Sequence, residues 1–210
     1  MTGGTGPDVM ALAAAERNDL ADLLDTLTDE EWAVPSLCEG WSVREVVAHV
    51  VSYEHLGWRG AIARMARARF DGGRANAMGV AAAADASTAD LVRTLRDRAR
   101  PSGLTAAFGG RIGLTDCTIY HQDIRRALDR PRVVPAERLV VVLDFALRAP
   151  PLPSRKAVRG LRLVATDLDW SHGDGPEVRG PGEALLMLVA GRRGALADLA
   201  GPGLDRLPAA

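Results

Sequence analysis

Side chains able to bind a metal ion or to move a proton gather in one short segment, residues 112–128. The segment contains Asp116, Cys117, Tyr120, His121 and Asp123 among apolar residues. Cys117 and His121 are four residues apart, as are Asp116 and Tyr120, and this spacing brings two side chains together on one helix. Imidazole, thiolate and carboxylate groups are the usual zinc ligands in proteins. This segment is therefore the first candidate for a metal site.

A metal site needs donors from more than one element, and His49 is the candidate from an earlier segment. We expect His49 and His121 as ligands, with Asp116 or Cys117 as the third donor. Asp123 could accept the second ring N–H of a ligating histidine, and Tyr120 would line the pocket. The alternative is a polar pocket without metal, in which Cys117 packs as a buried thiol. Spacing alone leaves both interpretations open.

Helical periodicity predicts the elements that position these residues. Apolar residues recur at helical spacing in residues 8–27, 87–99, 112–128, 135–147 and 181–199. Ser42 and Glu45 form a capping box, from which the sequence predicts one long helix to about Phe70. Trp58 and Ile62 continue the apolar face of that helix. The fold class predicted from these patterns is a mainly helical bundle.

Three prolines, Pro150, Pro151 and Pro153, predict a domain boundary. Residues 1–150 are then the helical bundle, and residues 151–210 a small C-terminal α+β domain. In this second part, residues 161–166 alternate like a strand, and residues 177–179 are expected to return antiparallel to it.

Composition excludes several classes of protein. The 210 residues include 26 Lys+Arg and 27 Asp+Glu, a net charge of −1, so we expect no nucleic acid or membrane partner. No apolar run approaches the roughly 20 residues that span a bilayer, and the N-terminal residues do not resemble a signal peptide. The expected location is the cytoplasm, and a homodimer is left open.

The stretch WAVPSLCEGWSVREVVAH, residues 32–49, resembles the N-terminal domain of the mycothiol-dependent maleylpyruvate isomerase family. The similarity continues in residues 69–76, 121–126 and 166–192. It implies a DinB-like four-helix bundle followed by a small C-terminal domain. It also implies a divalent ion, usually zinc, held by His49 and by a carboxylate-x-x-x-His pair on a later helix. Mycothiol or a similar thiol would be the cosubstrate, and a small electrophile the substrate.

The sequence departs from the family pattern at the second histidine. Asp116 matches the family carboxylate, but Tyr120 stands where the histidine is expected, and His121 is one residue later. One residue is a rotation of about 100° around a helix. The first hypothesis is a metal-dependent thiol transferase or isomerase that uses His49, Asp116 and His121. The second is a metal-free member that binds a small molecule or a partner at a degenerate site.

Overall fold

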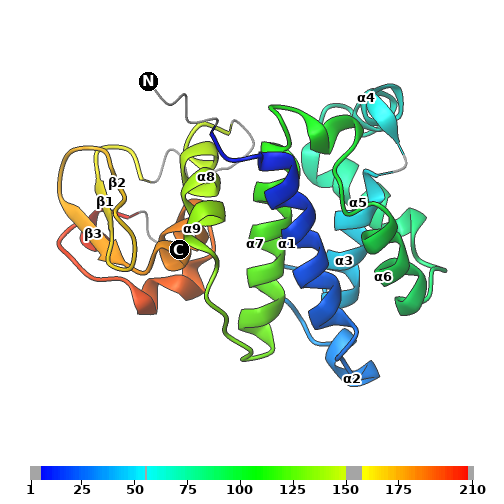
Figure 1. The fold of residues 1–210 in the computed structure, drawn as a ribbon, viewed down its shortest axis with the longest axis horizontal. Coiled ribbons are helices and arrows are strands. Elements are labelled where there is room, and N and C mark those ends of the chain that lie inside the picture. Colours follow the sequence, from blue (N-terminus) through cyan, green and yellow to red (C-terminus); the bar gives the residue numbers. More distant parts are fainter. Residues whose placement is uncertain (1–5, 55, 150–157, 208–210) are drawn as a thin grey trace. The chain divides into compact units, whose positions relative to one another are not determined.

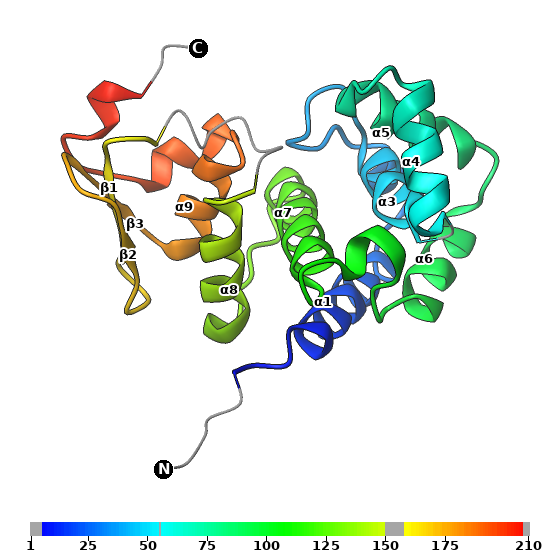
Figure 2. The same ribbon diagram turned by 90° about the horizontal axis from the view of Figure 1, so that it is seen from above.

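The computed structural model describes residues 6–54, 56–149 and 158–207. Contacts within the chain divide it into two compact units, Met1–Pro131 and Arg132–Ala210. Figures 1 and 2 show the first unit as helices and the second as helices with a small sheet. This confirms the predicted fold class, a helical bundle followed by a small α+β part.

The first unit is helical throughout its regular elements. They are α1 (Val9–Leu24), α2 (Asp29–Trp32), α3 (Val43–Ser52), α4 (Gly57–Arg67), α5 (Gly72–Ala82), α6 (Thr88–Asp97), the short 3-10 helix η1 (Gly103–Ala106) and α7 (Arg111–Ala127). Helix α1 packs on α6 and α7, and α3 packs on α5, α6 and α7. The core between them is built from apolar residues such as Leu20, Val47, Leu91, Cys117 and Ile124.

Local signals place α3 and α7 as the sequence predicts. Ser42 accepts from the Glu45 backbone N–H, and the Glu45 carboxylate accepts from the Ser42 N–H, so the capping box fixes the start of α3. Helix α7 covers the predicted segment to within a residue at each end. His49 on α3 and Asp116 on α7 are thereby held on facing helices.

The predicted long helix from Ser42 to Phe70 is interrupted. Helix α3 ends at Ser52, and α4 begins at Gly57, whose φ of +54° is accessible to glycine at little cost. Because the two helices are not continuous, the side chains of α4 do not continue the buried face of α3. As a result, α4 buries Ala61, Arg64 and Ala68, while Trp58 and Ile62 are exposed, contrary to the prediction.

The second unit consists of α8 (Ala136–Ala146), α9 (Gly182–Val189) and a three-stranded sheet in the order β2-β1-β3. Strand β1 (Arg162–Ala165) pairs antiparallel with β2 (Ser171–His172) and parallel with β3 (Glu177–Gly180). The expected antiparallel pairing of β1 with β3 is therefore wrong. Two short 3-10 helices, η3 (Arg193–Asp198) and η4 (Leu204–Arg206), complete the unit.

The boundary between the units differs from the prediction. The prolines at 150, 151 and 153 lie outside the described residues. The division precedes α8, because this helix packs on α9 of the second unit. In the described parts of the chain, no helix is both long and apolar enough to cross a membrane.

Candidate functional site

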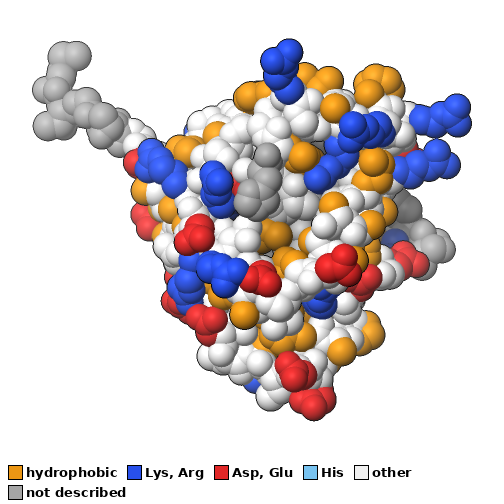
Figure 3. Space-filling model, turned by 90° about the vertical axis from the view of Figure 1, so that its right-hand side faces the viewer, with side chains coloured by type: hydrophobic (Ala, Val, Ile, Leu, Met, Phe, Trp, Pro, Cys, Tyr) orange, Lys and Arg blue, Asp and Glu red, His pale blue; other side chains and the backbone are white. Residues whose placement is uncertain are grey.

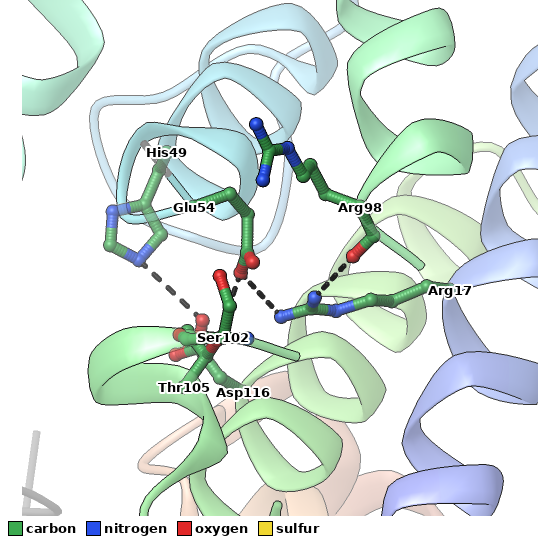
Figure 4. A network of polar contacts seen from close by, with 7 residues as sticks. All are labelled: Arg17, His49, Glu54, Arg98, Ser102, Thr105 and Asp116. Carbon is green, nitrogen blue, oxygen red and sulfur yellow. Dashed lines mark hydrogen bonds and ion pairs between the residues drawn. The ribbon is translucent and has the colours of Figure 1, made fainter. Parts of the chain in front are cut away.

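His49 and Asp116 face one another across the contact between α3 and α7. His49 is 3% exposed, because it lies on the buried face of α3 with Val46 and Val50. The His49 Nε2 atom is 3.9 Å from Asp116 Oδ2, and the Asp116 side chain is 38% exposed. Figure 4 shows the two side chains directed toward each other. A buried imidazole beside a solvent-accessible carboxylate can pass a proton between a ligand and the surface.

Three aromatic rings surround the His49 imidazole. Ring centroids of Trp41, Tyr53 and Tyr120 lie 5.0, 5.8 and 4.8 Å from that of His49. Tyr53 is one turn after His49 on α3, and Tyr120 is one turn after Asp116 on α7. Trp41 comes from the loop that precedes the capping box. The rings enclose the imidazole in an apolar environment.

Burial governs the charge of His49. Loss of hydration, with a smaller contribution from the Arg64 guanidinium, lowers the pKa of the His49 imidazole to about 4. The ring is therefore neutral near pH 7. Its Nδ1 atom is buried and has no hydrogen-bond partner among the described residues. Such a group is costly to bury unless a ligand or a water molecule satisfies it.

Arg64 of α4 supports the wall of this site. Its guanidinium donates to Ser52 Oγ and to the Ser52 carbonyl, and it lies 4.8 Å from the centroid of the Tyr53 ring. The Tyr53 hydroxyl donates to Asn76 Oδ1 at 2.9 Å, and burial raises the pKa of Tyr53, so this hydroxyl stays protonated. A Cβ atom at Gly79 would lie 2.6 Å from Arg64 Nη1, so α5 approaches this closely only because residue 79 is glycine.

The structure does not bring His121 to His49 and Asp116. His121 is fully buried and faces α1, where its Nδ1–H donates to Glu16 Oε1 at 2.9 Å. Arg125 Nε–H donates to His121 Nε2 at 2.8 Å, which identifies the neutral Nδ1–H tautomer. Both ring nitrogens are thus engaged within the protein. These contacts do not support His121 as a ligand together with His49 and Asp116.

A second buried polar network lies near the site (Figure 4). Arg17 of α1 donates to Glu54 Oε1 at 2.6 Å and to the Arg98 carbonyl at 2.8 Å. The Thr105 hydroxyl donates to the same Glu54 oxygen at 3.0 Å. Glu54 immediately follows Tyr53, so this network anchors the end of α3 to α1 and η1.

Comparison with known proteins identifies a related family for part of the chain. Residues 13–108 match the sequence model of the mycothiol maleylpyruvate isomerase N-terminal domain. Residues 13–108, which lie within the helical unit and end before α7, are therefore similar to a domain of this family. No curated protein matches the chain.

Two solved structures extend the similarity of fold beyond this N-terminal domain. A crystal structure of the mycothiol-dependent maleylpyruvate isomerase is 17% identical, with a TM-score of 0.56, over 92% of this chain and 91% of that one. A histidine-to-alanine mutant of that isomerase is 16% identical, with a TM-score of 0.57 and the same coverage. At these identities the likeness shows a shared fold.

The donor set around His49 and Asp116 does not fit the expected zinc ion. No group of three or more His, Cys, Asp or Glu side chains that could hold a metal occurs within the described residues. His49 and Asp116 supply two donors, and the third position is a tyrosine, whose phenol is not among the usual zinc ligands. Cys117 is fully buried in the apolar core, and Asp123 is fully buried on α7.

Sequence reasoning missed several residues of this site. Tyr53 could have been found, because it follows His49 by one helical turn. Arg64 gave no signal, because the prediction of one long helix placed Trp58 and Ile62 inward and left Arg64 on the solvent side. Asn76 lies in residues 74–84, where the apolar pattern is weak.

Proposed function

We propose that this chain binds a low-molecular-weight thiol of the mycothiol type. The protein would use the thiol either to isomerise a small electrophilic substrate or to form a thiol adduct of that substrate. The observation that carries this proposal is the convergence of His49 with Asp116 and Tyr120 of α7. His49 lies within the residues that match the mycothiol maleylpyruvate isomerase family. We further propose that protein side chains, rather than a zinc ion, receive the thiol.

The chemistry available at this cluster is acid–base catalysis of thiol addition. A neutral His49 can accept the thiol hydrogen bond, and Asp116 can stabilise the imidazolium that forms when the proton is taken. The 3.9 Å between His49 Nε2 and Asp116 Oδ2 is too long for a direct hydrogen bond.

The addition can be reversed after rotation. The thiolate forms a C–S bond at a double bond conjugated to a carbonyl, and the π electrons move to the carbonyl oxygen as an enolate. In this scheme the Tyr120 hydroxyl donates a hydrogen bond to that oxygen. The former carbon–carbon double bond is now a single bond and can rotate. Loss of the thiolate then restores the double bond in the other geometry. The thiol then recovers its proton.

A second candidate function is metal-free binding of a small molecule without catalysis. The observation that favours it is Tyr120 itself, because two donors and a phenol leave the cluster without the donors of a metal centre. Both candidates place a ligand at His49, so the experiment must separate binding from turnover.

Two measurements make this separation. Titration calorimetry with reduced mycothiol, with glutathione as the comparison thiol, measures binding. Chromatography of maleylpyruvate incubated with protein and mycothiol measures isomerisation, with and without a chelator. The variants are His49→Ala, Asp116→Asn and Tyr120→Phe, and the matched control is His172→Ala, an exposed histidine of the second unit.

The results discriminate as follows. Mycothiol-dependent isomerisation that survives chelation and is lost in His49→Ala supports the proposal. Mycothiol binding that depends on His49, without turnover, supports the second candidate. Turnover lost on chelation and restored by zinc contradicts the metal-free site, and absence of both binding and turnover contradicts both functions.

A further inference from the structure

Helix α4 directs its large apolar side chains into solvent. Trp58 is 53% exposed and Ile62 is 65% exposed, and they are one turn apart on the same face. The buried face of α4 consists of Ala61 and Arg64, with Ala68 just beyond. This helix therefore packs through alanine and one arginine and exposes its large apolar side chains, the reverse of an ordinary amphipathic surface helix.

The turn after α4 adds a third exposed apolar side chain. Phe70 is 80% exposed and has a φ of +62°, next to Arg69 with a φ of +57°. The left-handed conformation is unfavourable for a bulky residue, and the exposed ring gains no packing in return. Trp58, Ile62 and Phe70 are hereafter called the apolar ridge.

Arginines flank this ridge. Residues 57–84 contain five arginines and one acidic residue, although the whole chain has a net charge of −1. The side chains of Arg59, Arg67 and Arg69 are exposed and form no ion pair or hydrogen bond with any described residue. In Figure 3, blue side chains gather among orange ones at the upper end of the molecule, the level at which Figure 1 places α4.

The opposite end of the helical unit has the opposite charge. Residues 18–43 contain seven acidic residues and no Lys or Arg. Asp29, Glu30 and Glu39 are exposed and form no ion pair with the described residues. Leu27, Val34 and Leu37 are half-buried beside them. Figure 3 shows red side chains at the lower end of the same face, the level of α2 in Figure 1.

We propose that the occupant of the apolar ridge is a second copy of this chain, in an antiparallel dimer. A two-fold axis that lies in the plane of the face in Figure 3, perpendicular to the line from its basic end to its acidic end, brings the basic end of one protomer onto the acidic end of its partner. The reverse contact follows by symmetry. The contact between the ends of two protomers is then made twice, and the interface closes. An association of two α4 helices is disfavoured, because it would bring unpaired arginines together.

Charge reversal in a matched set of variants tests this dimer by sedimentation velocity. The basic-end variant is Arg59→Glu with Arg67→Glu, and the acidic-end variant is Asp29→Arg with Glu30→Arg. The control is Arg162→Glu with Arg206→Glu, two exposed arginines of the second unit. Circular dichroism melting curves establish that each variant is folded.

The wild type is expected to dimerise at low ionic strength, about 0.02 M, and to dissociate more readily at about 0.5 M. Each end variant alone should dimerise at least about tenfold more weakly, because like charges then meet twice. An equimolar mixture of the two end variants should restore the dimer as a heterodimer, and the control should match the wild type.

Other outcomes overturn the proposal. A wild type that stays monomeric at low ionic strength, or a dimer unaffected by both end variants, excludes this interface. Failure of the mixture to associate when each variant is folded also excludes it. A monomer that co-sediments with phosphatidylglycerol vesicles, and loses this in Trp58→Ala, would assign the apolar ridge to a membrane surface instead.

Discussion

A single position on α7 decides the donor chemistry of the site. Residue 120 faces His49, whereas residue 121 points to Glu16 on α1, since one residue is a rotation of about 100°. A histidine one place later in the sequence therefore belongs to a different buried network. The consequence is that the imidazole of His121 stabilises the bundle and the phenol of Tyr120 contributes to the site.

Replacing Tyr120 with histidine should create a zinc site. The introduced imidazole would join His49 and Asp116, which gives three donors from two rigid helices. We expect Tyr120→His to bind one zinc per chain by plasma mass spectrometry after dialysis, and the wild type and Tyr120→Phe to bind none. The idea fails if the wild type retains stoichiometric zinc, or if zinc in the wild type is lost on His121→Ala.

His49 should make the stability of the protein depend on pH. Burial lowers the pKa of His49 from 6.5 to about 4, so the unfolded chain binds a proton more readily than the folded one between these values. The free energy of unfolding should be greatest above about pH 6.5 and should fall toward pH 4, by up to about 3 kcal/mol. Urea unfolding curves from pH 4.5 to 7.5 measure this slope.

The matched variants for this slope are His49→Gln and His172→Gln. The first removes the buried titrating group, so its curve should be flatter between pH 4.5 and 6.5 than that of the wild type. The second changes an exposed histidine and should keep the wild-type slope. A wild-type slope in His49→Gln would assign the pH dependence to other groups.

At this scale the sequence predicts part of the site. His49, Asp116 and Tyr120 could each be named from spacing and resemblance, because i, i+4 pairs on a helix share a face. What spacing could not give is the direction in which each face points. That direction depends on which helix packs on α7, and Glu16 of α1 is too far away in sequence to be associated with His121 by any local pattern.

At the scale of the elements, the break between α3 and α4 is the main feature that the sequence conceals. The apolar residues of 43–65 keep a helical period, so a continuous helix is the simplest interpretation. A glycine with positive φ at position 57 is compatible with either interpretation, because glycine also occurs within helices. Only the packing of Arg64 against Ser52 and Tyr53 shows which face of α4 is buried.

The ion pair between Arg17 of α1 and Glu54, which follows α3, should behave as an energetically coupled buried pair. Arg17→Met leaves the Glu54 carboxylate buried without its guanidinium, and we expect a loss of about 3–5 kcal/mol in the free energy of unfolding. The double variant Arg17→Met with Glu54→Leu removes both charges and should recover much of that loss. Urea unfolding of the two single variants and the double variant gives the coupling energy. Additive losses would show that the pair is not energetically coupled.

At the scale of the whole molecule, the sequence predicts the order of the parts better than their boundary. A helical part precedes a mixed part, as the change in pattern after residue 150 indicates. Helix α8 was assigned to the bundle because its apolar face, with Leu139 and Leu143, has no feature that specifies a partner. Its packing on α9 joins it to the second unit, and pairing of that kind is a long-range choice that periodicity does not encode.

Two compact units should respond separately to a core mutation. Leu20 is fully buried in the core of the first unit, and Leu20→Ala should cost about 2–5 kcal/mol there. Native-state hydrogen exchange followed by mass spectrometry should show faster exchange in peptides of residues 9–127 and little change in residues 161–200. Equal acceleration in both units would show that they unfold together.

The four tryptophans provide an optical readout of this chain. Trp32 is buried in the core of the first unit, and Trp170 is buried in the second, where its indole N–H donates to Asp144. Trp41 lies 5.0 Å from the His49 ring, and Trp58 is on the apolar ridge. Ligand occupancy should therefore change the emission of Trp41, and self-association that of Trp58. Trp41→Phe and Trp58→Phe are the control variants that identify each signal. With them, the intrinsic fluorescence of the unlabelled protein distinguishes ligand binding at the site from dimerisation.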